Sequence, residues 1–206
     1  MYDTLALNEV DIKQQEAWRT ITLAMLLEHR AGFDRSRSGD PMLQHPPCPY
    51  DIGRLSAVQL DFTPGSAFAY SNLGYCLAGL ILERATARSL LDLYRSHIFE
   101  PLELDIASIT QRSDLEALDS ALRPAATELA ALESWNWQAL AAAGSLAGTA
   151  RDMGQVLYSL HREGSPLATA GRSLLMPLSS CDESLWRTCH GLAFYSYKKP
   201  GAKRMF

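Results

Sequence analysis

The stretch DFTPGSAFAYSNLGY, residues 61–75, carries the most information about the fold of this chain. Its Pro64-Gly65 pair predicts a turn that leads into an extended segment. Because side chains alternate along an extended segment, we expect Phe68 and Tyr70 to lie on the same side. The turn therefore presents a tyrosine phenol just ahead of the next element.

That next element is a helix, which we expect to begin at Leu73 with either Ser71 or Asn72 as its cap. The phenol of Tyr70 and the carboxamide of Asn72 then lie together at the mouth of the helix. This arrangement suits proton transfer beside a substrate amide. A Tyr-x-Asn pattern by itself is also typical of a buried tyrosine next to a helix cap, so the flanking segments must decide between the two.

Three segments point to one family. Residues 21–33, ITLAMLLEHRAGF, match an Ile-Thr-x-x-x-Leu-Leu-x-His-x-Ser-Gly-Leu helix and turn, with Ala31 in place of Ser. Residues 62–102 match a Tyr-x-Asn motif with its two helices, and residues 143–153, AGSLAGTARDM, match a glycine-rich strand end followed by a helix start. In this order the segments resemble the serine β-lactamase and penicillin-binding protein superfamily, most closely its branch with class C β-lactamases, DD-peptidases and related esterases.

The resemblance implies an α+β fold, in which the mostly helical part of the serine β-lactamase/DD-peptidase fold is joined by a partial antiparallel sheet. We expect residues 1–206 to form a single incomplete domain of this kind. Its helical subdomain is expected over about 20–162 and its partial sheet region over about 185–206. No internal repeat or low-complexity tract divides the chain.

The resemblance also implies roles for two residues. Complete members hydrolyse an amide, β-lactam or ester through a serine acyl-enzyme. Tyr70 matches the tyrosine that acts as general base or proton shuttle, and Asn72 matches the asparagine that contacts the substrate amide. β-Lactams, D-alanyl peptides and small esters are all substrates in this family, and fold does not choose among them.

The nucleophile motif of the family, Ser-x-x-Lys, does not precede the Tyr-Ser-Asn motif in these 206 residues. Its one match, Ser196 with Lys199, follows that motif instead, and Pro200 disfavours a helix at Lys199. The chemistry needs both residues on one helical turn, so that the amine reaches the hydroxyl. We interpret this match as chance and assign no nucleophile.

The third family motif, Lys-Thr-Gly or His-x-Gly, is also not found, since His190-Gly191 lacks the intervening residue. We expect it beyond Phe206. A phenol becomes a useful base near neutral pH only when cations lie beside it, and in relatives the lysines of these two motifs supply them. We therefore expect Tyr70 to stay neutral and the chain to be inactive as given.

Composition limits the other possibilities. A net charge of −4 argues against nucleic acid as a partner. No apolar run reaches membrane-spanning length, and no signal peptide is visible at the N-terminus. We expect no cofactor and no metal site, because the spacing of Cys181, Cys189 and His190 fits no zinc pattern. The expected partner is a small-molecule or peptide substrate, as in complete relatives.

Capping patterns predict several helices. Thr22 caps a short helix that ends at Gly32, and boxes of Ser or Thr with an acidic residue three positions later open further helices. These boxes are Ser89–Asp92 for a helix over 90–98, Ser113–Glu116, and Thr149–Asp152 for a helix to His161. A further helix buries the periodic residues Leu73, Cys76, Leu77, Leu80 and Ile81, with Gly74 and Gly79 permitting close packing. Residues 190–197 alternate weakly and predict a strand.

Two features leave alternatives open. His29, at the end of the first helix, favours the helix dipole as a cation, and we assign it a structural rather than a catalytic role. The Trp135-Asn136-Trp137 run suits core packing, although aromatic residues also line substrate clefts.

Three interpretations follow for the whole chain. It is an incomplete serine hydrolase that is inactive as given, a non-catalytic binding or interaction protein on the same scaffold, or a subunit whose nucleophile comes from another polypeptide. An incomplete sheet leaves strand edges and apolar faces uncovered, so we also expect marginal stability and self-association through the sheet edge.

Overall fold

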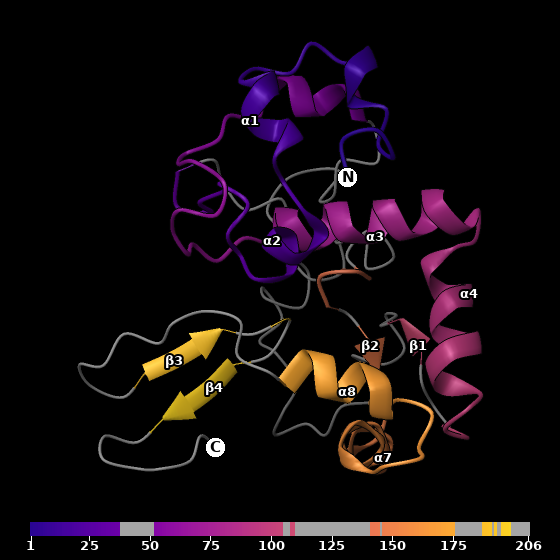
Figure 1. The fold of residues 1–206 in the computed structure, drawn as a ribbon. Helices are drawn as coiled ribbons and strands as arrows, with labels where there is room; N and C mark the ends of the chain where they lie inside the picture. The colour runs from indigo at the N-terminus through magenta and orange to yellow at the C-terminus, as the bar shows by residue number, and fades with distance from the viewer. Residues whose placement is uncertain are drawn as a thin grey trace, which may run out of the picture.

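The computed structural model describes residues 1–37, 52–104, 108–109, 141–144, 146–175, 187–190, 192 and 195–198. Helices far outweigh strands in this part of the chain (Figure 1). The helix expected at Ser113–Glu116, the Trp135-Asn136-Trp137 run and Cys181 lie outside the described residues.

The N-terminal layer of the molecule contains one continuous hydrophobic core. Its elements are η1 (Leu7–Glu9), α1 (Gln15–Arg19), α2 (Leu23–Leu27), η3 (Ile52–Ala57) and α3 (Asn72–Thr86). Trp18 and Phe33 are fully buried, and their ring centroids lie 5.3 Å apart. The core therefore includes residues before position 20, which the sequence patterns had not placed.

Helix α3 is the central element of this layer. Its periodic residues Leu73, Cys76, Leu77, Leu80 and Ile81 are all buried, which confirms the predicted helical face. A Cβ atom at Gly74 would lie 2.9 Å from the Leu26 carbonyl oxygen, and one at Gly79 would lie 2.5 Å from the Ala142 Cβ. Both glycines thus permit the close packing that was expected of them.

Helix α2 begins as predicted but ends earlier. The Thr22 side chain accepts a hydrogen bond from the Met25 N–H at 3.2 Å, which confirms the cap. The helix ends at Leu27, not at Gly32. His29 takes the left-handed position that follows, with φ 56°, and the Arg30 N–H bonds to the Met25 carbonyl as in a Schellman motif.

The second half of the described chain is built from locally capped helices. Ser89 caps α4 (Leu90–Tyr94), which continues as the π-helical turn η4 (Arg95–Phe99). Thr149 and Asp152 form both bonds of a capping box at the start of α7 (Ala150–His161). These two predicted starts are confirmed. Helix α8 (Ala168–Leu175) packs against α7, because Gly171 lets the Leu160 carbonyl approach its backbone.

The described strands form two separate antiparallel pairs. Ser108–Ile109 (β1) pairs with Leu146–Ala147 (β2), and Arg187–His190 (β3) pairs with Tyr195–Lys198 (β4). The single strand predicted over 190–197 is wrong, because β3 ends at His190 and Leu192 lies in a bend. We call the antiparallel pair of β3 and β4 the β3–β4 hairpin, since the two strands follow each other in the chain.

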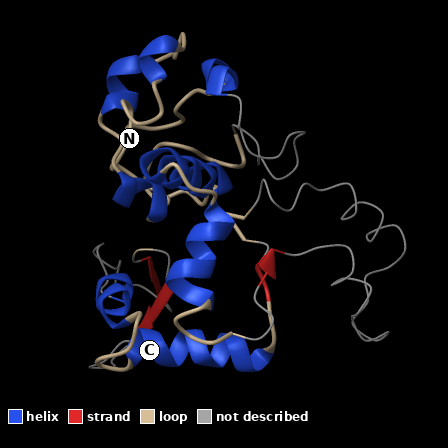
Figure 2. Ribbon diagram, turned by 90° about the vertical axis from the view of Figure 1, so that its right-hand side faces the viewer, coloured by secondary structure: helices blue, strands red, loops and turns tan. Residues whose placement is uncertain are grey.

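The N-terminal layer and the helices of the second half follow one another along the length of the molecule. In Figure 1, α1 lies at one end, α3 crosses the middle and α7 lies at the opposite end, with α4 running between them. Figure 2 shows the same order from the side, with α3 seen along its axis. The β3–β4 hairpin lies on the α7–α8 side of α3. None of the described helices combines the length and the hydropathy needed to span a membrane.

Candidate active site at the N-terminus of α3

The phenol and carboxamide singled out in the sequence meet at the start of α3. The Tyr70 hydroxyl donates a hydrogen bond of 3.0 Å to Asn72 Oδ1. Asn72 is 4% exposed, whereas Tyr70 is 36% exposed. A buried carboxamide thus orients the phenol of a partly exposed tyrosine, and the hydroxyl oxygen keeps lone pairs that can accept a further hydrogen bond.

The helix start differs from the expected one by a single residue. Helix α3 begins at Asn72 rather than Leu73, and Ser71 occupies the N-cap position with extended backbone angles. The Ser71 side chain makes no capping bond. Asn72 is therefore a helical residue, and its side chain is held by Tyr70 instead of by the helix end.

The imidazole ring of His29 packs against three aromatic rings, and that of Tyr70 is the nearest. Its ring centroid is 4.4 Å from that of Tyr70, 5.1 Å from that of Tyr75 and 5.9 Å from that of Phe68. The Ser71 N–H lies 3.1 Å from His29 Nδ1. Nδ1 accepts from this N–H when the imidazole carries its proton on Nε2. The same Nδ1 lies 3.2 Å from the Ser71 carbonyl oxygen, to which it would donate in the other tautomer.

This contact explains why a histidine occupies a left-handed backbone position. Such a conformation costs a non-glycine residue roughly 1–2 kcal/mol. In the tautomer with the proton on Nε2, the buried ring offsets that cost by satisfying the Ser71 N–H, which would otherwise be a buried donor without a partner. The contact with Ser71, rather than a charge at the helix end, thus accounts for His29 at this position. Its assignment as a structural rather than a catalytic residue stays a prediction.

Backbone hydrogen bonds fasten the Tyr70 loop to the turn after α2. The carbonyls of His29, Arg30 and Gly32 accept from loop residues 69, 65 and 61, at distances of 3.0, 2.8 and 2.8 Å. Gly32 has φ 104°, and a Cβ there would lie 2.7 Å from the Phe62 carbonyl. Only glycine fits this turn. The three hydrogen bonds hold the loop at residues 61, 65 and 69.

Arg35 is a residue at this site that the sequence patterns did not indicate. Its guanidinium carbon lies 5.4 Å from the centroid of the Tyr70 ring. Arg35 is exposed. A cation beside the phenol was expected only from lysines of the two family motifs not found here, and no local pattern around residue 35 indicates the contact.

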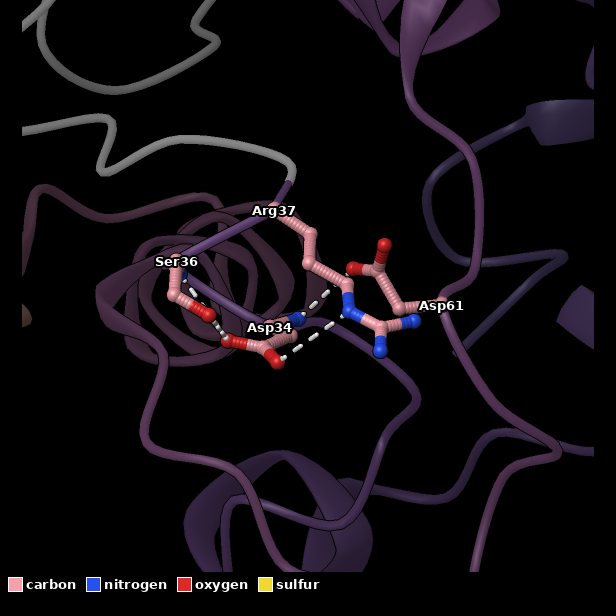
Figure 3. A network of polar contacts seen from close by, with 4 residues as sticks. All are labelled: Asp34, Ser36, Arg37 and Asp61. Atoms are coloured by element: carbon pink, nitrogen blue, oxygen red, sulfur yellow. Dashed lines mark hydrogen bonds and ion pairs between the residues drawn. The ribbon is translucent and has the colours of Figure 1, made fainter.

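The turn that carries Arg35 is fixed by polar contacts (Figure 3). Asp61 Oδ2 accepts from the Asp34 N–H at 2.9 Å, and Asp34 Oδ1 accepts from the Ser36 hydroxyl at 2.6 Å. Arg37 Nε lies 3.9 Å from Asp34 Oδ2. The Ser36 hydroxyl first, then the Ser36 N–H and Arg37, lower the pKa of Asp34 below its usual value.

The possible nucleophile Ser196 lies in strand β4. A Ser-x-x-Lys pair acts from one turn of a helix, and Ser196 is not on a helical turn. This agrees with its interpretation as a chance match. Among the described residues, no group of three or more His, Cys, Asp or Glu side chains is arranged to hold a metal ion.

Comparison with known proteins agrees with the sequence motifs. The Beta-lactamase family model matches residues 10–206. The putative fimbrial assembly protein FimD, serogroup D, of Dichelobacter nodosus is 34% identical over 187 residues, covering 88% of this chain and 46% of that protein. Penicillin-binding protein 4 of Amycolatopsis lactamdurans is 29% identical over 99 residues, covering 45% of this chain and 24% of that protein. The chain spans about half the length of the FimD relatives it matches.

Solved structures show the same fold. A penicillin-binding protein from Bacillus halodurans superposes with a TM-score of 0.63 at 20% identity, covering 97% of this chain and 67% of that one. The D-amino acid amidase of Ochrobactrum anthropi SV3, complexed with D-phenylalanine, gives a TM-score of 0.64 at 21% identity, covering 95% and 62%. The motifs, the family match and the shared fold together show that this chain belongs to the beta-lactamase family, that of the serine β-lactamase and penicillin-binding protein-like hydrolases.

Proposed function

We propose that these 206 residues supply one half of a serine acyl-hydrolase site, and that this half is catalytically silent on its own. The observation that carries the proposal is the bond from Tyr70 to the buried Asn72 at the mouth of α3, within a family of serine hydrolases. Ser-x-x-Lys does not precede this motif in the 206 residues, so the serine that such a motif activates is missing from this half of the site.

In the complete site, the serine, Tyr70 and Asn72 have different roles. A serine hydroxyl attacks the carbonyl carbon of an amide, β-lactam or ester, and its proton passes through Tyr70 to the leaving group. Asn72 contacts the substrate amide and holds the phenol in place. The part of the site described here orients a substrate and a proton shuttle, and the nucleophile completes it.

The test is an assay of the purified chain with a chromogenic cephalosporin and a short-chain ester at high protein concentration. We expect no turnover above buffer, and the same baseline for Tyr70→Phe. Tyr158→Phe, an exposed tyrosine on α7, is the matched control. Turnover that Tyr70→Phe abolishes and Tyr158→Phe preserves would overturn the proposed silence.

We extend the proposal to the organisation of the chain. Residues 1–206 form a single incomplete domain, with a helical subdomain over about 20–162 and a partial antiparallel sheet over about 185–206. The β3–β4 hairpin supports this assignment. Uncovered edges of such a sheet favour self-association, so sedimentation velocity should give a mass that rises with concentration. A single monomeric species at every concentration would contradict it.

A second candidate is a binding or assembly role on the same scaffold. The observation that favours it is the 34% identity to a protein named as a putative fimbrial assembly protein. Such a protein would bind a ligand at the Tyr70 site saturably and release it unchanged.

In the third candidate, another polypeptide supplies the nucleophile. It predicts that activity appears when this chain is mixed with the fragment carrying Ser-x-x-Lys.

A further inference from the structure

A cavity separate from the Tyr70 site lies between the turn after η4 and helix α7. Its volume of about 330 Å³ falls in the range of small-molecule and peptide sites. A smaller hollow of about 220 Å³ adjoins it, and Leu102, Glu103 and Gln155 line both. We call the two hollows together the α7 groove. The residues that line it do not belong to the junction of α2 with α3.

One wall of the α7 groove is a helix end with a fixed backbone. The Leu104 N–H bonds to the Phe99 carbonyl at 3.0 Å and the Glu103 N–H to the Glu100 carbonyl at 3.1 Å, which are the two bonds of a Schellman motif. Glu103 takes the left-handed position of the motif, with φ 51°. Glycine is the common residue there, because it has no Cβ. The groove thus has a carboxylate at a position where the backbone favours a residue without a side chain.

The opposite wall is the connection from α7 to α8. The Ser165 hydroxyl donates to the Ser159 carbonyl, and the Leu167 N–H bonds to the Oγ of the buried Ser159 at 3.3 Å. These bonds hold Pro166, which lines the groove together with Pro101 and gives it apolar surface. Both walls are therefore held by internal hydrogen bonds, so a ligand does not have to order them on binding.

The charges of the groove favour a cationic ligand. Glu103 and Glu163 both line the larger hollow, and Arg162 is the basic residue among its lining. The Arg162 guanidinium carbon lies 5.5 Å from the centroid of the Tyr158 ring. Within the described part of the chain, the Glu103 carboxylate has neither a hydrogen bond nor an ion pair. An ammonium or guanidinium group of a ligand would complement this carboxylate.

The length of the groove favours an extended peptide over a single amino acid. Arg151 lines the smaller hollow and Arg162 the larger one, and both are on the α7 side of the groove. The rise of an α-helix over this interval is about 16 Å, which corresponds to about five residues of an extended chain. The Gln155 carboxamide, between the two ends, carries the donor and the acceptor that a peptide group requires.

We propose that the α7 groove binds an extended peptide segment of about five residues with a central lysine or arginine, and that Glu103 recognises the basic side chain. The apolar surface of Pro101 and Pro166 packs against the neighbouring residues of the peptide. This inference goes beyond the proposed function, since it concerns a different part of the molecule and requires no acyl transfer.

The experiment measures binding of short peptides to the 206-residue chain. The probes are a pentapeptide of four alanines with a central lysine, blocked at both ends, and the same peptide with a central glutamine. The NMR signals of the Gly164 amide and the Gln155 carboxamide, which both line the groove, report binding. We expect the lysine peptide to bind roughly two- to fivefold more tightly at low salt, and the difference to shrink as salt is added.

Variants assign the preference to one carboxylate. Glu103→Gln should equalise the affinities of the two peptides by weakening the lysine peptide alone. Glu103→Gly should do the same without lowering the melting temperature, because glycine suits the left-handed backbone. Glu100→Gln is the matched control, since Glu100 is exposed three residues earlier and lines neither hollow. It should leave the preference intact.

Four results would overturn the inference. They are equal affinities of the two peptides for the unmodified chain, an unchanged preference in Glu103→Gln, an equal loss of preference in Glu100→Gln, and no shift of the Gly164 and Gln155 signals at millimolar peptide. N-acetyllysinamide, which carries the cation without the chain, separates a peptide site from a site for a single amine. It should bind more weakly than the lysine pentapeptide, and equal binding would overturn the proposed peptide. None of these results bears on the silence of the Tyr70 site, which the turnover assay tests by itself.

Discussion

The junction of α2 with α3 and the helix α7 are built by different rules. At the junction, the contacts that hold the site join residues far apart in sequence: His29 with Ser71, and Tyr75 with the Leu27 carbonyl, are 42 and 48 positions apart. At α7, the capping box joins Thr149 with Asp152, three positions apart. The site thus depends on tertiary structure, whereas the start of α7 is encoded locally.

This difference has a consequence for function. A locally capped helix tolerates changes on its surface, because each bond involves one turn. A loop fastened by long-range bonds holds its side chains in place only while both partners persist. We therefore expect substitutions at the junction to disturb both stability and the Tyr70–Asn72 geometry, and substitutions on α7 to disturb stability alone.

The largest effect is expected at His29. His29→Ala removes a buried ring and leaves the Ser71 N–H without its acceptor, so we expect a loss of about 2–4 kcal/mol in the free energy of unfolding. His161→Ala on α7 is the matched control, because His161 is exposed and its Nδ1 contacts the Leu157 carbonyl oxygen one turn earlier in the same helix. Urea denaturation followed by circular dichroism measures both. Equal, small effects at the two histidines would remove the distinction between the regions.

A pair of glycines sharpens the comparison. Gly74→Ala should lower the free energy of unfolding by about 1–3 kcal/mol, because the new Cβ meets the Leu26 carbonyl oxygen. A gain of up to about 1 kcal/mol in helix propensity is subtracted from this loss. Gly154→Ala in α7 meets nothing within 4 Å and should stabilise the protein by up to about 1 kcal/mol. Thermal unfolding should therefore shift in opposite directions. A shift of the same sign in both variants would contradict the close approach of α2 to α3.

A smaller effect is expected at the start of α7. Thr149→Ala removes the cap and should cost about 1 kcal/mol, while Thr149→Ser keeps a hydroxyl and should cost only a few tenths. The Tyr70 ring signals in NMR should be the same in both variants. Movement of those signals in Thr149→Ala would show that α7 and the site are coupled.

The smallest effect concerns pH. The lowered pKa of Asp34 means that its contribution to stability is present above the ordinary aspartate range, near pH 4, and is lost as the pH falls through the lowered folded-state value. Ser36→Ala removes the largest cause of that lowering. The difference in unfolding free energy between this variant and the parent should therefore be greater at neutral pH than in acid. A difference independent of pH would contradict the assignment.

The sequence predicted the elements better than the site. The caps at Thr22, Ser89 and Thr149 and the buried face of α3 follow from local rules, and the structure confirms them. The end of α2 was misplaced, since His29 rather than a glycine takes the left-handed position. Sequence alone could not show this, because the bond that stabilises the conformation comes from Ser71.

Long-range contacts, which local sequence patterns do not show, also explain why the candidate site was only partly predicted. Tyr70 and Asn72 are two residues apart, so their meeting at a helix start was predictable. Arg35 reaches Tyr70 only because the turn after α2 is fastened to the loop 61–69. The hairpin of β3 and β4 was taken for one strand, because weak alternation does not distinguish a continuous strand from two strands with a short loop.

The most direct test of this account is hydrogen exchange at the Ser71 amide. If the bond to His29 holds the Tyr70–Asn72 pair in place, this amide should exchange slowly in the parent chain and fast in His29→Ala. It should be slow again in His29→Asn, since asparagine tolerates the left-handed backbone and carries an acceptor oxygen near the position of Nδ1. Rapid exchange of the Ser71 amide in the parent chain, under conditions where the α3 core stays protected, would contradict the account.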